Sequence, residues 1–278
     1  MTEYDFKKRP IVYQMPGMDL VEVRKNNTFK RTPELDLQFD VYLPTNLQAG
    51  EQRPAVFLVH GDHWPDVLRD AKDWKCFETW GRLLAASGLI AVVFTHRSTD
   101  GLMDAELVSD DIQDCIDYVR DCASEFKINK DCIAMWASSG GVPVAINAAF
   151  AKSRPYLKCL TFYYGYMHLA PGAHYGDPEA PAELLSKFSA LEMLQSGELE
   201  WPPLLIVRAG QDKPLLNASI SEFVIEAIKR NIPLSFINHS EGHHAFDNLD
   251  QLEESKTIIQ QTVLFLKQQL LQSVEEFK

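Results

Sequence analysis

The chain has 278 residues, of which 46% are hydrophobic and 24% charged, a composition typical of a folded globular protein that excludes extensive disorder. Its formal net charge of −12 argues against nucleic acid and anionic membranes as partners, because binding a polyanion needs clustered Lys and Arg. The longest apolar run, residues 83–94, is too short to span a bilayer, and the N-terminus lacks a hydrophobic signal core. The five cysteines include no close pair and several of them fall on apolar faces, which favours reduced thiols. We therefore expect a cytoplasmic protein.

The first half of the chain begins with two stretches of alternating polarity, residues 20–24 and 35–41, which predict an antiparallel pair of half-exposed strands at a sheet edge. Residues 54–59 form a continuous apolar run and predict a buried strand, followed by the polar loop His60-Gly61-Asp62-His63-Trp64. We expect a helix over 73–86, a buried strand over 89–95 and a long amphipathic helix over 104–126.

The second half continues with a strand from residue 132, a helix to 150 and a strand over 157–164. Residues 165–200 then break this rhythm, with one predicted helix near 186–195, and we interpret them as a lid or pocket wall. Strands over 203–209 and 233–238 alternate with helices over 216–230 and 250–272. This alternation predicts parallel crossovers and a sheet covered on both faces, within a single domain over residues 1–278.

A sharp turn that carries two serines joins the strand and the helix of residues 132–150. Such a strand-turn-helix exposes one side chain at the top of a parallel sheet, and it requires small residues two positions before and after that side chain. Counting from Ser139, these residues are Ala137 and Gly141, whereas counting from Ser138 the first would be Trp136. Ser139 is therefore the predicted nucleophile.

A serine hydroxyl needs a base near pH 7, and the base needs an anionic partner that holds its tautomer. Asp212 follows the strand over 203–209, and His244 follows the strand over 233–238, so both belong at the carboxyl edge of the sheet. His243 remains the alternative base. Among the carboxylates, Asp212 is preferred to Asp177 and Asp247 because only Asp212 comes directly after a buried strand.

Four segments together resemble the α/β-hydrolase superfamily, especially its dienelactone-hydrolase and carboxylesterase-like branches: His60-Gly61, the turn of residues 137–141, Gly210-Gln-Asp212-Lys-Pro, and Gly242-His-His244-Ala-Phe. The resemblance covers roughly residues 20–270. It implies an α/β-hydrolase fold, with a mostly parallel central sheet, antiparallel N-terminal edge strands and helices on both faces. It also selects His244, since the catalytic histidine of the family commonly precedes a small and then an aromatic residue.

The chain departs from the family pattern in several places. Ala137 replaces the first glycine of the turn, and the nucleophile is Ser where dienelactone hydrolases use Cys. The His-Gly-Gly-Gly string of one esterase branch is here His60-Gly61-Asp62-His63. The resemblance then implies an oxyanion hole formed by the backbone N–H groups of Asp62 and Gly140, with Gly61 as the substitute for Asp62. His60 is expected to brace this loop through hydrogen bonds.

These features predict a serine hydrolase that cleaves carboxylic esters of small molecules through an acyl-enzyme, with no cofactor. His63, Trp64 and Tyr166 are expected to contact substrate. Two alternatives stay open: a peptidase or acyl- or thioester-processing member of the superfamily, and a ligand-binding protein that has kept the fold without catalysis. A metal site built from His60, Asp62 and His63, or from His239, His243 and Asp247, is disfavoured because neither set has a defined ligand spacing.

Overall fold

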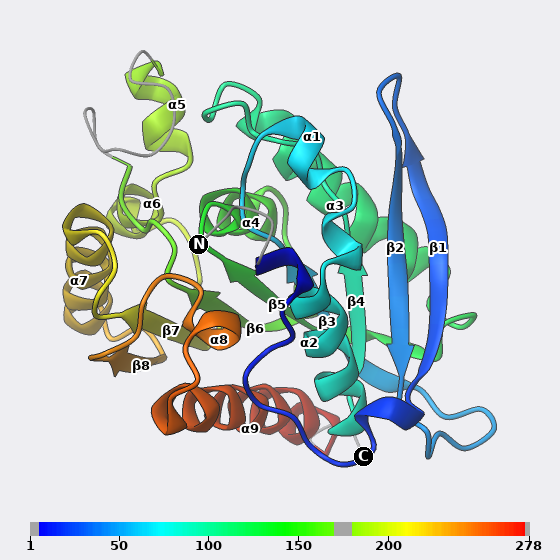
Figure 1. Cartoon of the computed structure of the whole chain (residues 1–278). Coiled ribbons are helices and arrows are strands. Elements are labelled where there is room, and N and C mark those ends of the chain that lie inside the picture. The colour runs from blue at the N-terminus through cyan, green and yellow to red at the C-terminus, as the bar shows by residue number, and fades with distance from the viewer. Residues whose placement is uncertain (1–5, 170–179, 276–278) are drawn as a thin grey trace.

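The computed structural model describes residues 6–169 and 180–275, with side chains described to residue 271 (Figure 1). Its described residues form one eight-stranded sheet in the order β1-β2-β4-β3-β5-β6-β7-β8. The strands are β1 (Glu22–Arg31), β2 (Asp36–Leu43), β3 (Arg53–Val59), β4 (Ile90–Phe94), β5 (Ile128–Ser138), β6 (Leu157–Tyr163), β7 (Leu204–Ala209) and β8 (Leu234–His239). Strand β2 pairs antiparallel with β1 and β4, and the other neighbours pair in parallel.

The α-helices lie in the connections that follow β3 and after β8, the last strand. They are α1 (Pro65–Leu68), α2 (Lys75–Ala86), α3 (Ala105–Asp121), α4 (Gly141–Phe150), α5 (Ala182–Lys187), α6 (Ala190–Ser196), α7 (Pro214–Lys229), α8 (Phe246–Leu249) and α9 (Glu253–Glu275). Short 3₁₀ helices cover Phe6–Lys8, Met18–Leu20 and Ala71–Asp73. No helix in the described ranges combines the length and the apolar character needed to cross a bilayer.

Two hydrophobic cores lie on opposite faces of the sheet. Alternate residues of β3 divide between them: Phe57 belongs to the core that includes residues of α3, α4 and α7, and Val56 and Leu58 belong to the core that includes residues of α2, α9 and the segment 11–18. This period-two division follows from the pleat of the strand and explains why β3 is apolar from Pro54 to Val59. The expected α/β-hydrolase fold, with antiparallel strands at the N-terminal edge, is confirmed (Figure 1).

Two of the predicted helices differ from the structure. The helix expected over 104–126 ends at Asp121, because Cys122 adopts a non-helical backbone and the chain then turns toward β5. The helix expected near 186–195 is wrong in its bounds, since two short helices, α5 and α6, occupy residues 182–196. The break falls at Phe188 and Ser189, where the Ser189 hydroxyl caps α6 by accepting a hydrogen bond from the Glu192 N–H.

All five cysteines are free thiols. Cys122 is partly exposed and the other four are buried, so the cysteines contribute apolar packing.

Candidate active site

Ser139 lies in the sharp turn between β5 and α4, at the carboxyl edge of the sheet. Its φ of +53° is in the left-handed region, which a residue with a Cβ adopts only under constraint. The Ser139 N–H donates to the Tyr163 carbonyl at 2.9 Å, and its carbonyl accepts from the Val142 N–H at 3.1 Å. Backbone bonds to β6 and to the first turn of α4 therefore hold the strained residue in place.

Gly141 permits this turn because the end of β3 lies against it. A Cβ at residue 141 would be 2.1 Å from the His60 carbonyl oxygen. A turn this sharp would also bring positions 137 and 141 close together. In the structure, the atoms nearest to a Cβ at 141 instead belong to His60 and Val59. Gly165 is confined in the same way, since a Cβ there would lie 2.9 Å from the Ser139 carbonyl oxygen.

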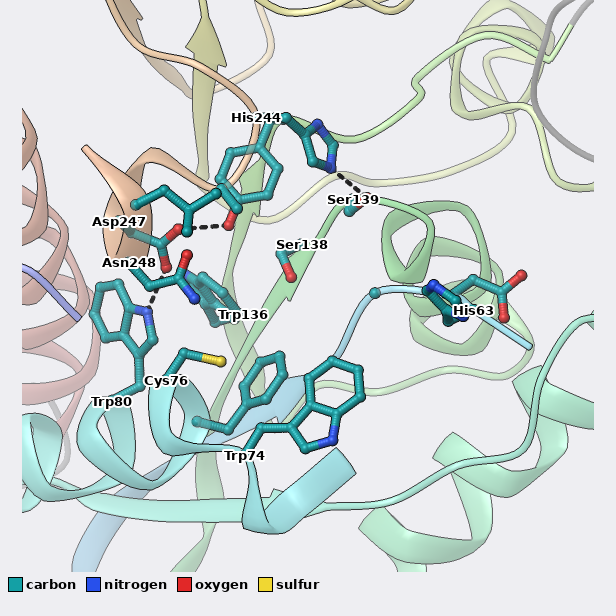
Figure 2. Close-up of a pocket in the computed structure, with 16 residues that line it drawn as sticks. His63, Trp74, Cys76, Trp80, Trp136, Ser138, Ser139, His244, Asp247 and Asn248 are labelled. Carbon is teal, nitrogen blue, oxygen red and sulfur yellow. Dashed lines mark hydrogen bonds between the residues drawn. The ribbon is translucent and has the colours of Figure 1, made fainter. Parts of the chain in front are cut away.

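The three side chains selected from the sequence form one hydrogen-bonded chain. Ser139 Oγ lies 2.8 Å from His244 Nε2 (Figure 2). His244 Nδ1 lies 2.5 Å from Asp212 Oδ2. This geometry fits the tautomer in which Nδ1–H donates to Asp212 and Nε2 accepts from the serine hydroxyl. The Asp212 side chain is only 3% exposed, whereas that of His244 is 42% exposed, so the imidazole can reach both the carboxylate and an incoming molecule.

The competing residues take other partners. The His243 side chain is 67% exposed, and both its N–H and its Nδ1 contact Asp250. Asp247 is buried and accepts hydrogen bonds from Trp80 and Tyr164. Asp177 lies outside the described residues.

The loop after β3 lies directly against the serine. A Cβ at Gly61 would be 3.2 Å from Ser139 Cβ and 3.7 Å from Ser139 Oγ, so this backbone borders the hydroxyl. The Asp62 carboxylate accepts from both the N–H and the hydroxyl of Thr99, which ties the loop to the segment after β4. Gly140 follows the serine as the N-cap residue of α4. The oxyanion role of the Asp62 and Gly140 N–H groups stays a prediction.

His60 braces this loop, as expected. Its Nδ1–H donates to the Gly61 carbonyl at 2.8 Å, and its Nε2 accepts from the His96 N–H at 3.2 Å. The two imidazoles stack with ring centroids 3.6 Å apart. Burial lowers the pKa of His60 well below its ordinary value, and the nearby His96 lowers it further, so His60 acts as a neutral hydrogen-bonding group. His96 was not singled out from the sequence, in which it is one histidine in the loop after a buried strand.

A cavity of about 390 Å³ opens beside Ser139 and His244 (Figure 2). His63 lines it, and the expected contact of His63 with substrate stays a prediction. Trp64 is 70% exposed and lines a smaller adjoining pocket of about 190 Å³. Tyr166 is buried outside the cavity lining; burial raises its phenol pKa, and the charge of Asp212 raises it further.

Aromatic residues missing from the sequence prediction form much of the cavity wall: Trp74, Phe77, Trp80, Trp136 and Tyr164. Trp74 and Phe77 fall on the apolar face of the helix predicted over 73–86, and such a pattern cannot separate a core residue from a cavity residue. In the described part of the chain, no three His, Cys, Asp or Glu side chains are grouped so as to hold a metal ion.

Comparison with known proteins finds a family model that matches part of the chain and solved structures with a similar fold. A family model described as BD-FAE matches residues 39–162. The native esterase 2 of Thermogutta terrifontis is 17% identical, with a TM-score of 0.67 over 93% of this chain and 94% of that chain. The same esterase phosphonylated by cyclosarin is 16% identical, with a TM-score of 0.68 over 93% and 95% of the two chains. A variant of esterase rPPE is 14% identical, with a TM-score of 0.70 over 93% and 85%.

A search of curated proteins found no match. At these identities the solved structures establish the fold, and the chain is an α/β-hydrolase-fold protein similar to esterases of known structure. The dienelactone-hydrolase-like branch is not singled out by these comparisons.

Proposed function

We propose that this protein is a serine hydrolase that cleaves carboxylic esters of small molecules. The observation that carries the proposal is the chain of hydrogen bonds from Ser139 through His244 to Asp212, at a strained turn that opens onto a cavity. The similarity in fold to esterases, one of them phosphonylated, supports the same reaction class.

In the proposed reaction, Ser139 Oγ attacks the ester carbonyl carbon while His244 Nε2 takes the hydroxyl proton. The carbonyl oxygen becomes an oxyanion, which the N–H groups of Asp62 and Gly140 stabilise, with Gly61 as the alternative to Asp62. His244 returns the proton to the leaving alcohol, and the acyl group stays on Ser139. Water then attacks the acyl-enzyme by the same steps and releases the acid.

Asp212 acts on the imidazole rather than on the substrate. Its carboxylate accepts the Nδ1–H bond and stabilises the imidazolium that forms during each proton transfer. The Lys213 N–H donates to the other carboxylate oxygen at 2.7 Å, which orients Asp212 toward His244.

Labelling by a fluorophosphonate tests the nucleophile. The natural chain should be labelled and Ser139→Ala should not. Ser138→Ala is the matched control, because Ser138 precedes Ser139 in the turn, lines the same cavity and should leave labelling intact. Labelling that survives in Ser139→Ala contradicts the proposal.

Substrate panels separate the related reactions. We expect turnover of p-nitrophenyl esters and little turnover of aminoacyl p-nitroanilides, whereas the reverse would indicate a peptidase. Acyl thioesters tested beside matched oxygen esters would reveal a thioester-processing enzyme. A purified chain that binds small ligands but turns over none of these substrates would be a binding protein.

The proposal extends to the organisation and location of the protein. We propose a single hydrolase domain in which residues 165–200 cover the site. Residues 170–179 lie outside the described part of the chain, and the described residues of 165–200 are not among those that line the cavity. Helices α5 and α6 contact each other, and α6 also contacts α4 and α7. We also propose a cytoplasmic location, for which the five free thiols are the support.

A further inference from the structure

One wall of the cavity beside Ser139 is a continuous set of aromatic rings. Trp80 and Trp136 have ring centroids 5.2 Å apart, and Trp74 and Phe77 are 6.1 Å apart. Tyr164, on the other side, packs 4.8 Å from the His244 imidazole. Figure 2 shows the labelled tryptophans arranged around the space that the serine faces.

A carboxylate lies within this aromatic lining. Asp247, the second residue of α8, lines the cavity and is only 3% exposed. Its Oδ2 accepts from Trp80 Nε1 at 2.8 Å, and its Oδ1 accepts from the Tyr164 hydroxyl at 2.6 Å (Figure 2). Both donors are neutral.

Within the described part of the chain, the Asp247 carboxyl group has no Lys or Arg partner. Among the described residues, no Lys or Arg lines the cavity, and none forms a salt bridge with this carboxylate. Burial raises the pKa of Asp247, and the bonds from Trp80 and Tyr164 do not offset that effect. His244 is the nearby group that can become positive, but its two nitrogens bond to Ser139 and Asp212.

Aromatic faces and an unpaired carboxylate favour the same kind of ligand. The π-faces of Trp and Tyr attract cations, and the attraction strengthens where water is excluded. A buried carboxylate without a cation is costly, so a positive ligand group gains from pairing with it. The formal charge of −12 also raises the concentration of cations near the protein.

We propose that this cavity binds an alkylammonium group, so that the ester substrate carries a positively charged nitrogen beside the bond that is cleaved. The ester part of this statement rests on the proposed function, whereas the cation site rests on the cavity itself. An aromatic wall alone would accept a neutral apolar group equally well. The Asp247 carboxylate, which lies among these rings, is the feature that distinguishes a cation from its neutral equivalent. The other carboxylate of the lining, Asp62, accepts hydrogen bonds from Thr99 in the loop after β4.

Binding of two alcohols of the same shape tests this inference without catalysis. Choline and 3,3-dimethylbutan-1-ol differ in having a quaternary nitrogen or a quaternary carbon, and both can be titrated calorimetrically into the Ser139→Ala chain. We expect choline to bind at least about tenfold more tightly. Equal binding, tighter binding of the neutral alcohol, or no binding of either overturns the proposal.

A second substitution locates the preference. Adding Asp247→Asn removes the charge but keeps a side chain of the same shape, and the preference for choline should fall to within about twofold. Asp66→Asn is the matched control, since Asp66 is an exposed residue of α1 outside the cavity and its loss changes the net charge equally. A preference that survives in Asp247→Asn, or is lost in Asp66→Asn, contradicts the assignment. If Asp247→Asn does not fold, the relative affinity of the Ser139→Ala chain for the two alcohols still tests whether the cavity prefers a cation.

The outcomes for the two proposals are separable. Fluorophosphonate labelling and turnover of p-nitrophenyl esters by the natural chain test the nucleophile. The calorimetric comparison uses a chain that lacks the nucleophile, so its result does not depend on turnover. Labelling with no preference for choline would support the serine hydrolase and contradict the cation site. A preference for choline without labelling or turnover would support the cation site and contradict the serine hydrolase.

Discussion

Replacing Gly141 with alanine tests how closely the serine turn depends on the neighbouring strand. The new Cβ would lie 2.1 Å from the His60 carbonyl oxygen, where ordinary contact begins at 3.4 Å, and both atoms are fixed to backbone. The turn and the end of β3 must therefore separate by about 1 Å, a displacement that can cost on the order of a hundredfold in rate when it misplaces reacting groups. Forcing a methyl group into such a packed contact also costs about 1–3 kcal/mol of stability.

The assay combines kcat/KM on a p-nitrophenyl ester with urea denaturation. Gly50→Ala is the control, because Gly50 has a φ of +77° with no atom within 4 Å, so alanine is strained there but touches nothing. We expect Gly50→Ala to lose about 1 kcal/mol of stability and to keep its activity. Gly141→Ala should lose stability, by about 1–3 kcal/mol, and also activity, on the order of a hundredfold. If Gly141→Ala keeps kcat/KM within about twofold of the natural chain, the close fit of the turn does not position the nucleophile.

Three further outcomes are expected. Asp212→Asn should lower kcat by about 10⁴, since an amide does not hold the His244 tautomer, and a loss below about tenfold in steady-state turnover would refute that role. Asp111→Asn should lower the free energy of unfolding by about 2 kcal/mol at pH 7. The buried Asp111 side chain accepts two hydrogen bonds from Arg97, at 2.7 and 2.8 Å, and the substitution removes its charge. Burial alone would raise the pKa of Asp111, but the hydrogen bonds and positive charges of Arg97 and Lys30 together outweigh it, and the pKa is lowered. The stability difference should therefore be full above about pH 4 and vanish as the pH falls through the lowered pKa, and a difference that persists at low pH in chemical denaturation would contradict this. Cys122, the only partly exposed thiol, should react first with a thiol reagent in the native protein, and simultaneous reaction of all five would show that the burial is wrong.

The hydrogen-bonded chain at the site could be anticipated because each member follows a predicted strand of the sheet. Parallel strands carry their carboxyl ends to one edge, so Ser139, Asp212 and His244 were expected together although the sequence separates them widely. The choice of His244 over His243 came from the family resemblance. The structure shows the geometric difference: Ala245 has a φ of +60° where α8 begins, and His243 turns toward Asp250 while His244 reaches the serine.

The cavity wall could not be anticipated in this way. Trp80 and Trp136 belong to a helix and a strand whose inner faces are apolar, and the same pattern describes an ordinary core. Asp247 was considered from the sequence only as a rival acid or as one of a disfavoured set of metal ligands. Its bonds to Trp80 and Tyr164 join residues 167 and 83 positions apart along the chain, and no local pattern indicates such contacts.

The sequence alone determined the order of strands and helices, the two-sided covering of the sheet and the position of the serine turn. Hydrophobic periodicity and the need for small residues at tight turns act over a few neighbouring positions, so they can be read locally. The tertiary structure alone decided the contact of Gly141 with the His60 carbonyl, the stacking of His60 on His96 and the aromatic cavity with its carboxylate. They depend on side chains from different elements meeting in space, and their energies come from burial and distance rather than from local order.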